Sequence, residues 1–230
     1  MDFINFAHKY TTKMAPFHLC PTVKWLETAG STNNELRMMA EGADNLTFLA
    51  TESQTEGRGQ HSNKWYSVPG DSLTFSYLLK PSGSLALKAS ESLLITCATS
   101  LAVRDYLAGE GIKAAIKWPN DIWVDGKKIC GILIENSVVD GYVVQSIVGV
   151  GLNLGGTSWP SDLPNPVSIE QLTGRRPCPH EALDSLSMQI CRRWEEAFTT
   201  GGRLSLQEEF GKCVFMLNAD KQSFPSDPAL

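Results

Sequence analysis

The stretch DIWVDGKKICGILIENSVVDGYVVQSIVGVGLN, residues 121–153, decides the fold of this chain. Its apolar residues alternate with polar ones, and two pairs, Asp125-Gly126 and Asp140-Gly141, interrupt the alternation. An Asp-Gly pair between alternating apolar runs is the strongest short-range signal for a tight β-hairpin. The stretch therefore predicts consecutive antiparallel strands joined by two hairpin turns.

Other segments supply further strands and two long helices. An apolar run at residues 46–52 predicts a buried strand, and the alternation in residues 72–80 predicts another. Apolar residues at helical spacing predict core helices over residues 85–107 and 183–198, the second closed by Gly201-Gly202. These elements predict an α+β fold class, with a mixed, largely antiparallel sheet flanked by helices.

The remaining segments suggest how the chain is organised. Residues 52–72 and 155–180 contain Gly and Pro and are expected to be loops, the second with one short helix. We expect an N-terminal extension over residues 1–21, one folded domain over residues 22–202 and a short C-terminal tail over residues 203–230.

The composition excludes several classes of partner. The chain has 20 Lys and Arg against 25 Asp and Glu, a formal net charge of −5, so we expect binding to neither nucleic acid nor a membrane. Six scattered cysteines without zinc spacing predict reduced thiols. Without a signal-peptide pattern or about 18 consecutive apolar residues, the chain is expected to be soluble and cytoplasmic. Any anionic substrate would require cations gathered locally in a site.

Three short segments allow two interpretations each. Gly57-Arg58-Gly59 is either a loop that approaches an anionic ligand or a flexible surface loop. Lys117, before a Trp-Pro step, either extends from a strand end to solvent or is a fixed point cation in a site. Ser31-Thr32-Asn33 precedes a helix predicted over residues 34–42. A capping box of Thr32 and Glu35 explains it, and contact with a polar ligand is compatible with that role.

Familiar nucleotide motifs are missing from the sequence. GVGLNLGG, residues 149–156, resembles a dinucleotide fingerprint, but its third glycine falls one place late and no helix is expected after it. The segment is a predicted strand that runs into a loop, so we expect a structural turn there rather than a dinucleotide site. The sequence contains no G-x-x-x-x-G-K-[ST], H-E-x-x-H or G-x-S-x-G, so any ATP chemistry would use another kind of phosphate site.

Five segments together resemble the biotin protein ligase family, in the family's order and approximate spacing. They are Gly-Ser-Thr-Asn at 30–33, Gln54 with Gly-Arg-Gly at 57–59 and Trp65, Lys-Trp-Pro-Asn-Asp at 117–121, Gly-Ile-Leu-Ile-Glu at 131–135 and Gly-Val-Gly-Leu-Asn at 149–153. The resemblance implies a catalytic domain over residues 22–202 that is related to class II aminoacyl-tRNA synthetases. It also implies a monofunctional type without a DNA-binding domain, and a C-terminal β-barrel that is absent or truncated.

The same resemblance implies an ATP-dependent ligase that forms biotinyl-5′-AMP and transfers biotin to a lysine of a biotin carboxyl carrier protein. Lys117 and Arg58 are the implied catalytic residues. The implied biotin-binding residues are Ser31, Thr32, Asn33, Gln54, Gly57, Arg58, Gly59, Gln60, Lys117 and Gly131. The implied ATP-binding residues are Arg58, Lys64, Trp65, Lys117, Asn120 and Asn153.

ATP and Mg²⁺ are the implied cofactors, and Mg²⁺ is expected to arrive with ATP rather than on permanent protein ligands. The implied partner is the carrier protein or domain of a biotin-dependent carboxylase, and the chain is also a candidate for a homodimer. Gln60 stands where the commonest family pattern has a second arginine. Two other functions stay open: a lipoyl or octanoyl transferase, which would need a long apolar tunnel, and a non-catalytic binder of biotin or its adenylate.

Overall fold

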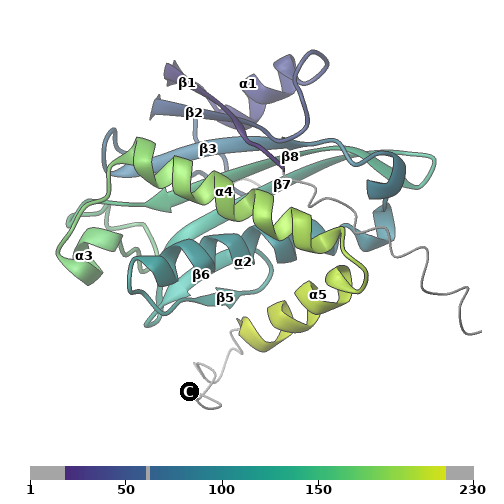
Figure 1. Cartoon of the computed structure of the whole chain (residues 1–230). Coiled ribbons are helices and arrows are strands. Elements are labelled where there is room, and N and C mark those ends of the chain that lie inside the picture. The colour runs from purple at the N-terminus through teal and green to yellow at the C-terminus, as the bar shows by residue number, and fades with distance from the viewer. Residues whose placement is uncertain (1–18, 61–62, 216–230) are drawn as a thin grey trace, which may run out of the picture.

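The computed structural model describes residues 19–60 and 63–215, which form one mixed sheet with helices on both faces (Figure 1). Within these residues the sheet has nine strands, in the order β1-β2-β3-β8-β7-β6-β5-β9, with β4 beside β8. The strands are β1 Thr22–Ala29, β2 Thr47–Gln54, β3 Ser72–Leu79, β4 Leu87–Lys88, β5 Ala115–Lys117, β6 Asp121–Val124, β7 Lys127–Val139, β8 Tyr142–Asn153 and β9 Val214–Phe215. The helices are α1 Thr32–Met39, α2 Leu93–Gly109, α3 Ile169–Thr173, α4 Pro179–Ala197 and α5 Gly202–Cys213.

The predicted fold class is confirmed. β1 pairs with β2 in parallel, as β5 does with β9, and the other pairs among the described strands are antiparallel. Both Asp-Gly hairpins are present. Asp125 and Asp140 have φ angles of 47° and 50°, and the glycines after them 78° and 79°, the left-handed values that a two-residue hairpin turn requires.

The pleat of β3 separates two apolar layers. Phe75 and Tyr77 belong to the large core cluster that also contains residues of α2 and α4, whereas Leu78 packs with Leu36 of α1. Successive side chains of a strand point to opposite faces, so helices cover both faces at this point. All eight residues of β3 are buried as a result.

The first core helix begins later than predicted. Residues 83–91 form two short 3₁₀ turns around β4, and α2 starts at Leu93. Leu87 pairs with Val143 of β8, so this apolar residue belongs to a strand of the sheet and not to a helix. The strands expected at 46–52 and 72–80 and the helix expected at 183–198 are confirmed as β2, β3 and α4.

Besides β4, three elements were not predicted. β1 lies in parallel beside β2, and β9 beside β5. α5 directly precedes β9 and occupies part of the segment that was expected to be a tail. It buries Leu206 and Phe210 against the core. Residues 203–215 of the predicted tail therefore pack against the domain predicted over residues 22–202. The boundaries at residues 21 and 202 stay predictions, and the expectations for residues 1–18 and 216–230 lie outside the described residues.

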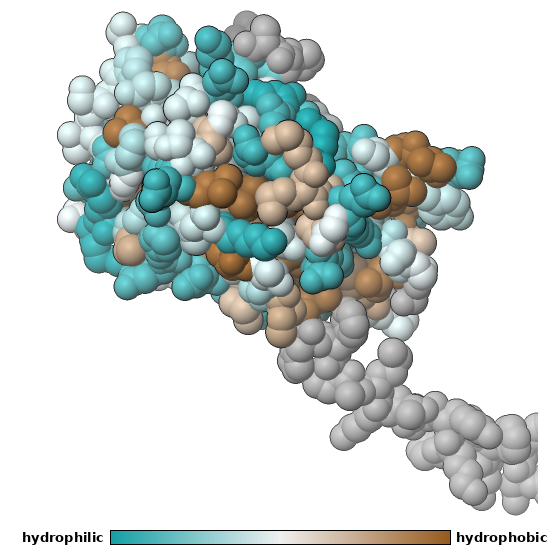
Figure 2. All heavy atoms as spheres, turned by 90° about the horizontal axis from the view of Figure 1, so that it is seen from above, coloured by the Kyte–Doolittle hydropathy of each residue, from teal (hydrophilic) through white to brown (hydrophobic). Residues whose placement is uncertain are grey.

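The surface of the described chain gives two further facts. No helix in the described ranges is long and apolar enough to cross a membrane. Val138, Val139 and Val144 are exposed near the tip of the β7–β8 hairpin. A hydrophobic group stands out in Figure 2 at the end of the molecule where this hairpin projects in Figure 1.

The six cysteines are free thiols, as predicted. Cys97, Cys130 and Cys191 are buried. Burial raises the pKa of the Cys97 thiol to about 11 and is the main cause that raises that of Cys191 to about 12. These buried thiols therefore stay protonated and unreactive at neutral pH.

Candidate active site

Glycines on the sheet face that carries α1 form the floor of a cavity. Gly131 of β7 pairs with Gly151 of β8, and Gly149 lies two residues further along β8 on the same face. A Cβ atom at Gly149 would overlap the side-chain amide of Asn33, and one at Gly151 would overlap the indole of Trp65. Glycine is thus required where two other segments approach the sheet. Residues 149–153 lie inside β8 and the chain continues as a loop after Asn153, so the predicted strand running into a loop is confirmed here.

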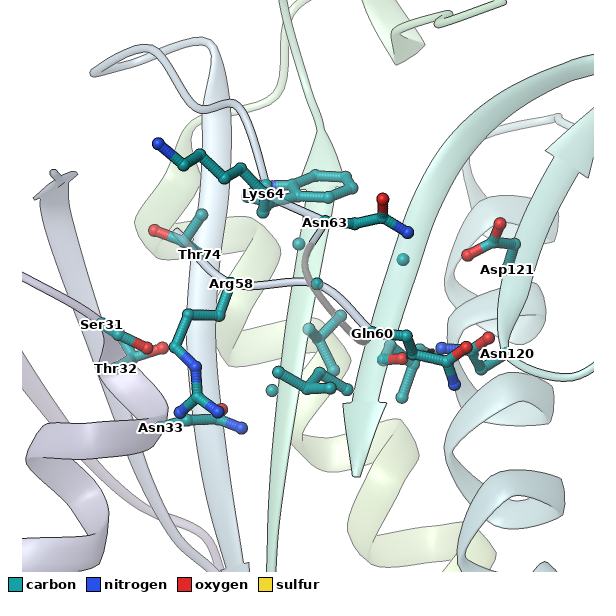
Figure 3. Close-up of a pocket in the computed structure, with 18 of the residues that line it drawn as sticks. Ser31, Thr32, Asn33, Arg58, Gln60, Asn63, Lys64, Thr74, Asn120 and Asp121 are labelled. Carbon is teal, nitrogen blue, oxygen red and sulfur yellow. Dashed lines mark hydrogen bonds between the residues drawn. The ribbon is translucent and has the colours of Figure 1, made fainter. Parts of the chain in front are cut away.

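A cavity of about 270 Å³ lies over this floor (Figure 3). The start of α1, the loop between β2 and β3 and the connection between β5 and β6 surround it. The structure brings every predicted site residue to its wall except Gly57 and Asn153. The predicted residues that line it are Ser31, Thr32, Asn33, Gln54, Arg58, Gly59, Gln60, Lys64, Trp65, Lys117, Asn120 and Gly131.

Gly57 and Asn153 lie outside the cavity wall. The carbonyl of Gly57 accepts a hydrogen bond from the Trp65 amide at 2.9 Å, and a Cβ atom at Gly57 would overlap the Trp65 carbonyl. Gly57 therefore lets the two sides of the loop approach each other. Asn153 is buried at the end of β8, where its Nδ2 donates to the carbonyl of Val167 at 3.0 Å. Its amide supports the segment after β8 rather than facing the cavity.

Neutral polar groups form one end of the cavity. The backbone amide of Thr32 donates to Oε1 of Gln54 at 3.0 Å, and the hydroxyls of Thr32 and Ser76 lie 2.7 Å apart. Ser76 in turn donates to Oδ1 of Asn33 at 2.5 Å. Ser31, Thr32, Asn33 and Ser76 are all buried. This end offers fixed donors and acceptors without charge, which suits a neutral polar ligand.

The capping-box prediction for this segment is wrong. The N-cap of α1 is Ser31, with φ −149° and ψ 126°, and its side chain makes no capping hydrogen bond within the described chain. The Thr32 hydroxyl is directed to Ser76 across the sheet instead. The polar side chains at the start of this helix are therefore committed to the cavity and not to the helix end.

The glycine-rich loop, residues 57–60 and 63–65 of the described chain, lies over the floor. The amide of Gly59 donates to the carbonyl of Asn63 at 2.8 Å, so the two sides of the loop pair like a short hairpin. The Trp65 indole rests against Gly131 and Gly151, and its Nε1 is buried without a hydrogen-bond partner among the described residues. Lys64 is exposed, and Figure 3 shows its side chain directed away from Asn120 and Asp121.

Two lysines of the cavity wall lie beside Asp121, which Figure 3 shows across the cavity from Ser31 and Thr32. Nζ of Lys117 lies 4.4 Å from the centroid of the Trp123 ring. Lys128 also lines the cavity, with Nζ 2.7 Å from Oδ1 of Asp121 and 5.7 Å from the Trp65 ring centroid. Sequence reasoning missed both Lys128 and Asp121 as wall residues. With Lys117 and Lys128 against the one carboxylate of Asp121, this end carries the net positive charge that an anionic substrate requires.

A β-bulge explains why Lys128 was missed. Ile122 pairs with Cys130, but the next residue, Trp123, pairs with Lys128, so Ile129 is an extra residue in β7. Ile129 and Cys130 are both fully buried. Strict alternation would direct Lys128 to the same face as Cys130, whereas the extra residue reverses the alternation and allows Lys128 to reach the cavity.

A carboxylate just outside the cavity connects the glycine-rich loop to α1. Oε1 of Glu135 accepts from Nη2 of Arg58 at 2.9 Å. Its Oε2 accepts from Asn33 at 2.7 Å and lies 2.7 Å from Nη2 of Arg37. Burial raises the pKa of Glu135, but the hydrogen bond from Asn33 and the two arginine charges outweigh it and hold the pKa below its ordinary value. Glu135 is therefore ionised at neutral pH.

The side chains around the cavity limit how a metal ion could be bound there. No group of three or more His, Cys, Asp and Glu side chains that could hold a metal occurs in the described residues. Asp121 is the one carboxylate among the residues that line the cavity as described. Such a wall fits Mg²⁺ that is bound largely by phosphate oxygens and water, with at most one protein carboxylate.

Comparisons with known proteins agree with this geometry. The family model described as "Biotin/lipoate A/B protein ligase family" matches residues 25–153. Biotin--[acetyl-CoA-carboxylase] ligase of Paracoccus denitrificans is 33% identical over 185 residues, which are 77% of this chain and 74% of the relative. The bifunctional ligase/repressor BirA of Bacillus spizizenii is 30% identical over 158 residues, 67% of this chain but only 48% of that protein.

A solved structure extends the similarity to three dimensions. The biotin protein ligase from Aquifex aeolicus, in complex with biotin and ATP, has a TM-score of 0.68 and 26% identity. The match covers 82% of this chain and 76% of that chain. Because the family model matches more than half of the sequence, and the similar fold carries the cavity described above, this chain belongs to the biotin/lipoate A/B protein ligase family.

Proposed function

We propose that this protein is an ATP-dependent biotin protein ligase. It forms biotinyl-5′-AMP from biotin and ATP, and then transfers the biotinyl group to a lysine of a carrier protein. The Paracoccus relative is named for ligating biotin to acetyl-CoA carboxylase, which supports the carboxyl carrier domain of a carboxylase as the acceptor.

One observation carries this proposal: a single cavity has a neutral polar end and a cationic end. Ser31, Thr32 and Gln54 suit the ureido group of biotin, which is neutral and has both donors and acceptors. Lys117 and Lys128 suit the two anions that must meet, the biotin carboxylate and the α-phosphate of ATP. Asn120 and Trp65, at the same wall, are our candidates for contacts to the nucleotide.

In the first step a carboxylate oxygen of biotin attacks the α-phosphorus. A carbon–oxygen–phosphorus anhydride forms, the bond to the β-phosphate oxygen breaks, and pyrophosphate leaves. No protein nucleophile is needed, so the contribution of the protein is positioning and charge stabilisation. Lys117 and Lys128 act here by reducing the repulsion between the two anions.

Mg²⁺, when bound to the phosphates, would neutralise negative charge on them and on the departing pyrophosphate. Asp121 is the carboxylate of the cavity wall that could contact Mg²⁺. Its Oδ1 lies 2.7 Å from Nζ of Lys128. The other residues of the site bind and orient the substrates.

In the second step the amine of the acceptor lysine attacks the carbonyl carbon of the anhydride, its bond to the phosphate oxygen breaks, and AMP leaves. Biotinyl-5′-AMP is labile to water, so the glycine-rich loop has a purpose in covering it. Exposed valines at the hairpin tip support the predicted homodimer, and the net charge of −5 supports the prediction that the protein does not bind nucleic acid. Its location in the cytoplasm stays a prediction from the sequence.

Pyrophosphate exchange tests the proposal. The protein is incubated with radiolabelled pyrophosphate, ATP, Mg²⁺ and biotin, and parallel samples contain lipoate or octanoate instead. Exchange into ATP that depends on biotin is the expected result. Exchange with lipoate or octanoate alone would favour an enzyme that activates and transfers those acids instead of biotin. Biotin binding in calorimetry without exchange would favour the non-catalytic binder.

A further inference from the structure

Glu135 is the residue at which the glycine-rich loop and α1 meet. It does not line the cavity, but its two carboxylate oxygens accept from Arg58 of the loop and from Asn33 of α1, and one of them forms an ion pair with Arg37 of α1. All three distances are 2.9 Å or less. Its side chain is 24% exposed, so these interactions are only partly screened by water.

Arg58 is committed to these contacts. Its Nη2 donates to Glu135 at 2.9 Å and its Nη1 donates to Oδ1 of Asn34 at 2.7 Å. Figure 3 shows the Arg58 side chain directed toward Asn33 at the start of α1. The guanidinium therefore joins the loop to α1 and β7 through two charge-assisted hydrogen bonds, and the one to Glu135 is also an ion pair. Because Glu135 is paired with both Arg37 and Arg58, it neutralises only part of the Arg58 charge.

Hydrogen bonds through Asn33 connect the Glu135 carboxylate to the neutral end of the cavity. Asn33 donates to Glu135 and accepts from Ser76, whose hydroxyl also contacts Thr32. A chain of hydrogen bonds thus runs from the predicted ureido site to the arginine that fixes the loop. Glu135 thus binds both the glycine-rich loop, through Arg58, and the neutral end of the cavity, through Asn33.

We propose that Glu135 is a positioning residue: through Arg58 it holds the glycine-rich loop over the cavity and slows the escape of the acyl-adenylate. This inference rests on the proposed function. Glu135 contacts neither the cavity nor the reacting atoms, so it acts on retention of the intermediate and not on its formation. Asn34, which binds the other nitrogen of Arg58, supports the same position of the loop.

The test uses the full chain and four variants. Glu135→Ala removes the anchor, Glu135→Gln removes its charge, and Asn34→Ala removes the second contact of Arg58. Arg37→Ala is the matched control, because it removes an arginine from the same carboxylate without touching the loop. Two quantities are measured: the rate at which trypsin cuts after Arg58 or Lys64 without ligand, and the rate at which labelled biotinyl-5′-AMP leaves the protein in a chase.

Glu135→Ala is expected to increase both rates about tenfold, as for the loss of a partly exposed charge-assisted hydrogen bond, and Asn34→Ala about threefold. Glu135→Gln should lie between wild type and Glu135→Ala. Arg37→Ala should stay within about twofold of wild type, and the single-turnover rate of adenylate formation should change little in all four, within the usual scatter of surface substitutions. A merely structural effect would slow formation as well.

Wild-type release and cleavage rates in Glu135→Ala would overturn the inference. So would an additive effect of Glu135→Ala in an Arg58→Ala background, monitored at Lys64, because a residue that acts through Arg58 has nothing to add there. An increased KM for biotin with unchanged release would show that Glu135 acts through Asn33 instead. If the wild type forms no adenylate, the proposed function fails, while trypsin cleavage still decides whether Glu135 holds the loop.

Discussion

Replacing Gly149 with alanine should weaken biotin binding although the residue makes no side-chain contact of its own. The added Cβ atom would overlap Oδ1 of Asn33, and its Cγ would lie only 3.0 Å away, so the Asn33 side chain must move. Asn33 would then lose its hydrogen bond from Ser76 and its hydrogen bond to the carboxylate of Glu135.

The structure sets the size of the effect. Within the protein, the two lost hydrogen bonds, about 1 kcal/mol for the neutral one and about 2 kcal/mol for the one to Glu135, should lower the free energy of unfolding by up to about 3 kcal/mol. A displaced Asn33 also withdraws one polar contact of about 1.4 kcal/mol from the predicted biotin site, so the dissociation constant for biotin should rise about tenfold.

Titration calorimetry with biotin measures this directly, and thermal unfolding checks that the variant is folded. Gly42→Ala is the matched control, because a Cβ atom there has no neighbour within 4 Å, and it should bind biotin as wild type does. A Gly149→Ala protein that binds biotin within about twofold of wild type, at the scatter of neutral substitutions, would refute the assigned role of Asn33.

Three other predictions follow from the structure. Lys117→Ala and Lys128→Ala should each slow biotin-dependent pyrophosphate exchange by about 100-fold or more, whereas the exposed Lys127→Ala should not; unchanged exchange would contradict the cationic end. The pKa of Glu135 is lowered in the folded protein, so its contribution to the free energy of unfolding is present at neutral pH and is lost as the pH falls through that lowered pKa. Denaturant titrations over about pH 3 to 7 should therefore find Glu135→Gln less stable than wild type at neutral pH only, and a constant difference would argue against this. Arg193, whose side chain is 11% exposed, forms ion pairs with carboxylates of α2, α4 and α5. Arg193→Ala should therefore lower the free energy of unfolding by about 3 kcal/mol in urea titrations. A loss below about 1 kcal/mol would show that these ion pairs contribute little to stability.

Much of the sheet could be predicted because its signals are local. The turns at Asp125-Gly126 and Asp140-Gly141 need left-handed backbone angles that this residue pair accepts, and alternation sets the faces of the flanking strands. β1 and α5 were missed for the opposite reason. β1 is a parallel neighbour of β2, and α5 is stabilised mainly by its contacts with other helices, so neither depends chiefly on a local pattern.

Most candidate site residues came from the family resemblance, not from periodicity. The exceptions follow from the packing. Lys128 reaches the cavity because of a bulge at Ile129 that alternation cannot foresee. Asn153 lies in the predicted motif but its amide faces the backbone of Val167, outside the cavity.

Residues close in the chain were thus sufficient for the hairpins, the main strands and the two core helices, because backbone geometry and side-chain alternation depend on neighbours in sequence. The arrangement of the site depends on distant segments. Asn33 lies against Gly149, Trp65 against Gly151, and Glu135 accepts from a residue 102 positions earlier. Such contacts form only when the sheet and α1 are packed together. Glycine is needed at these positions of β8 because the side chains of other segments lie directly over them.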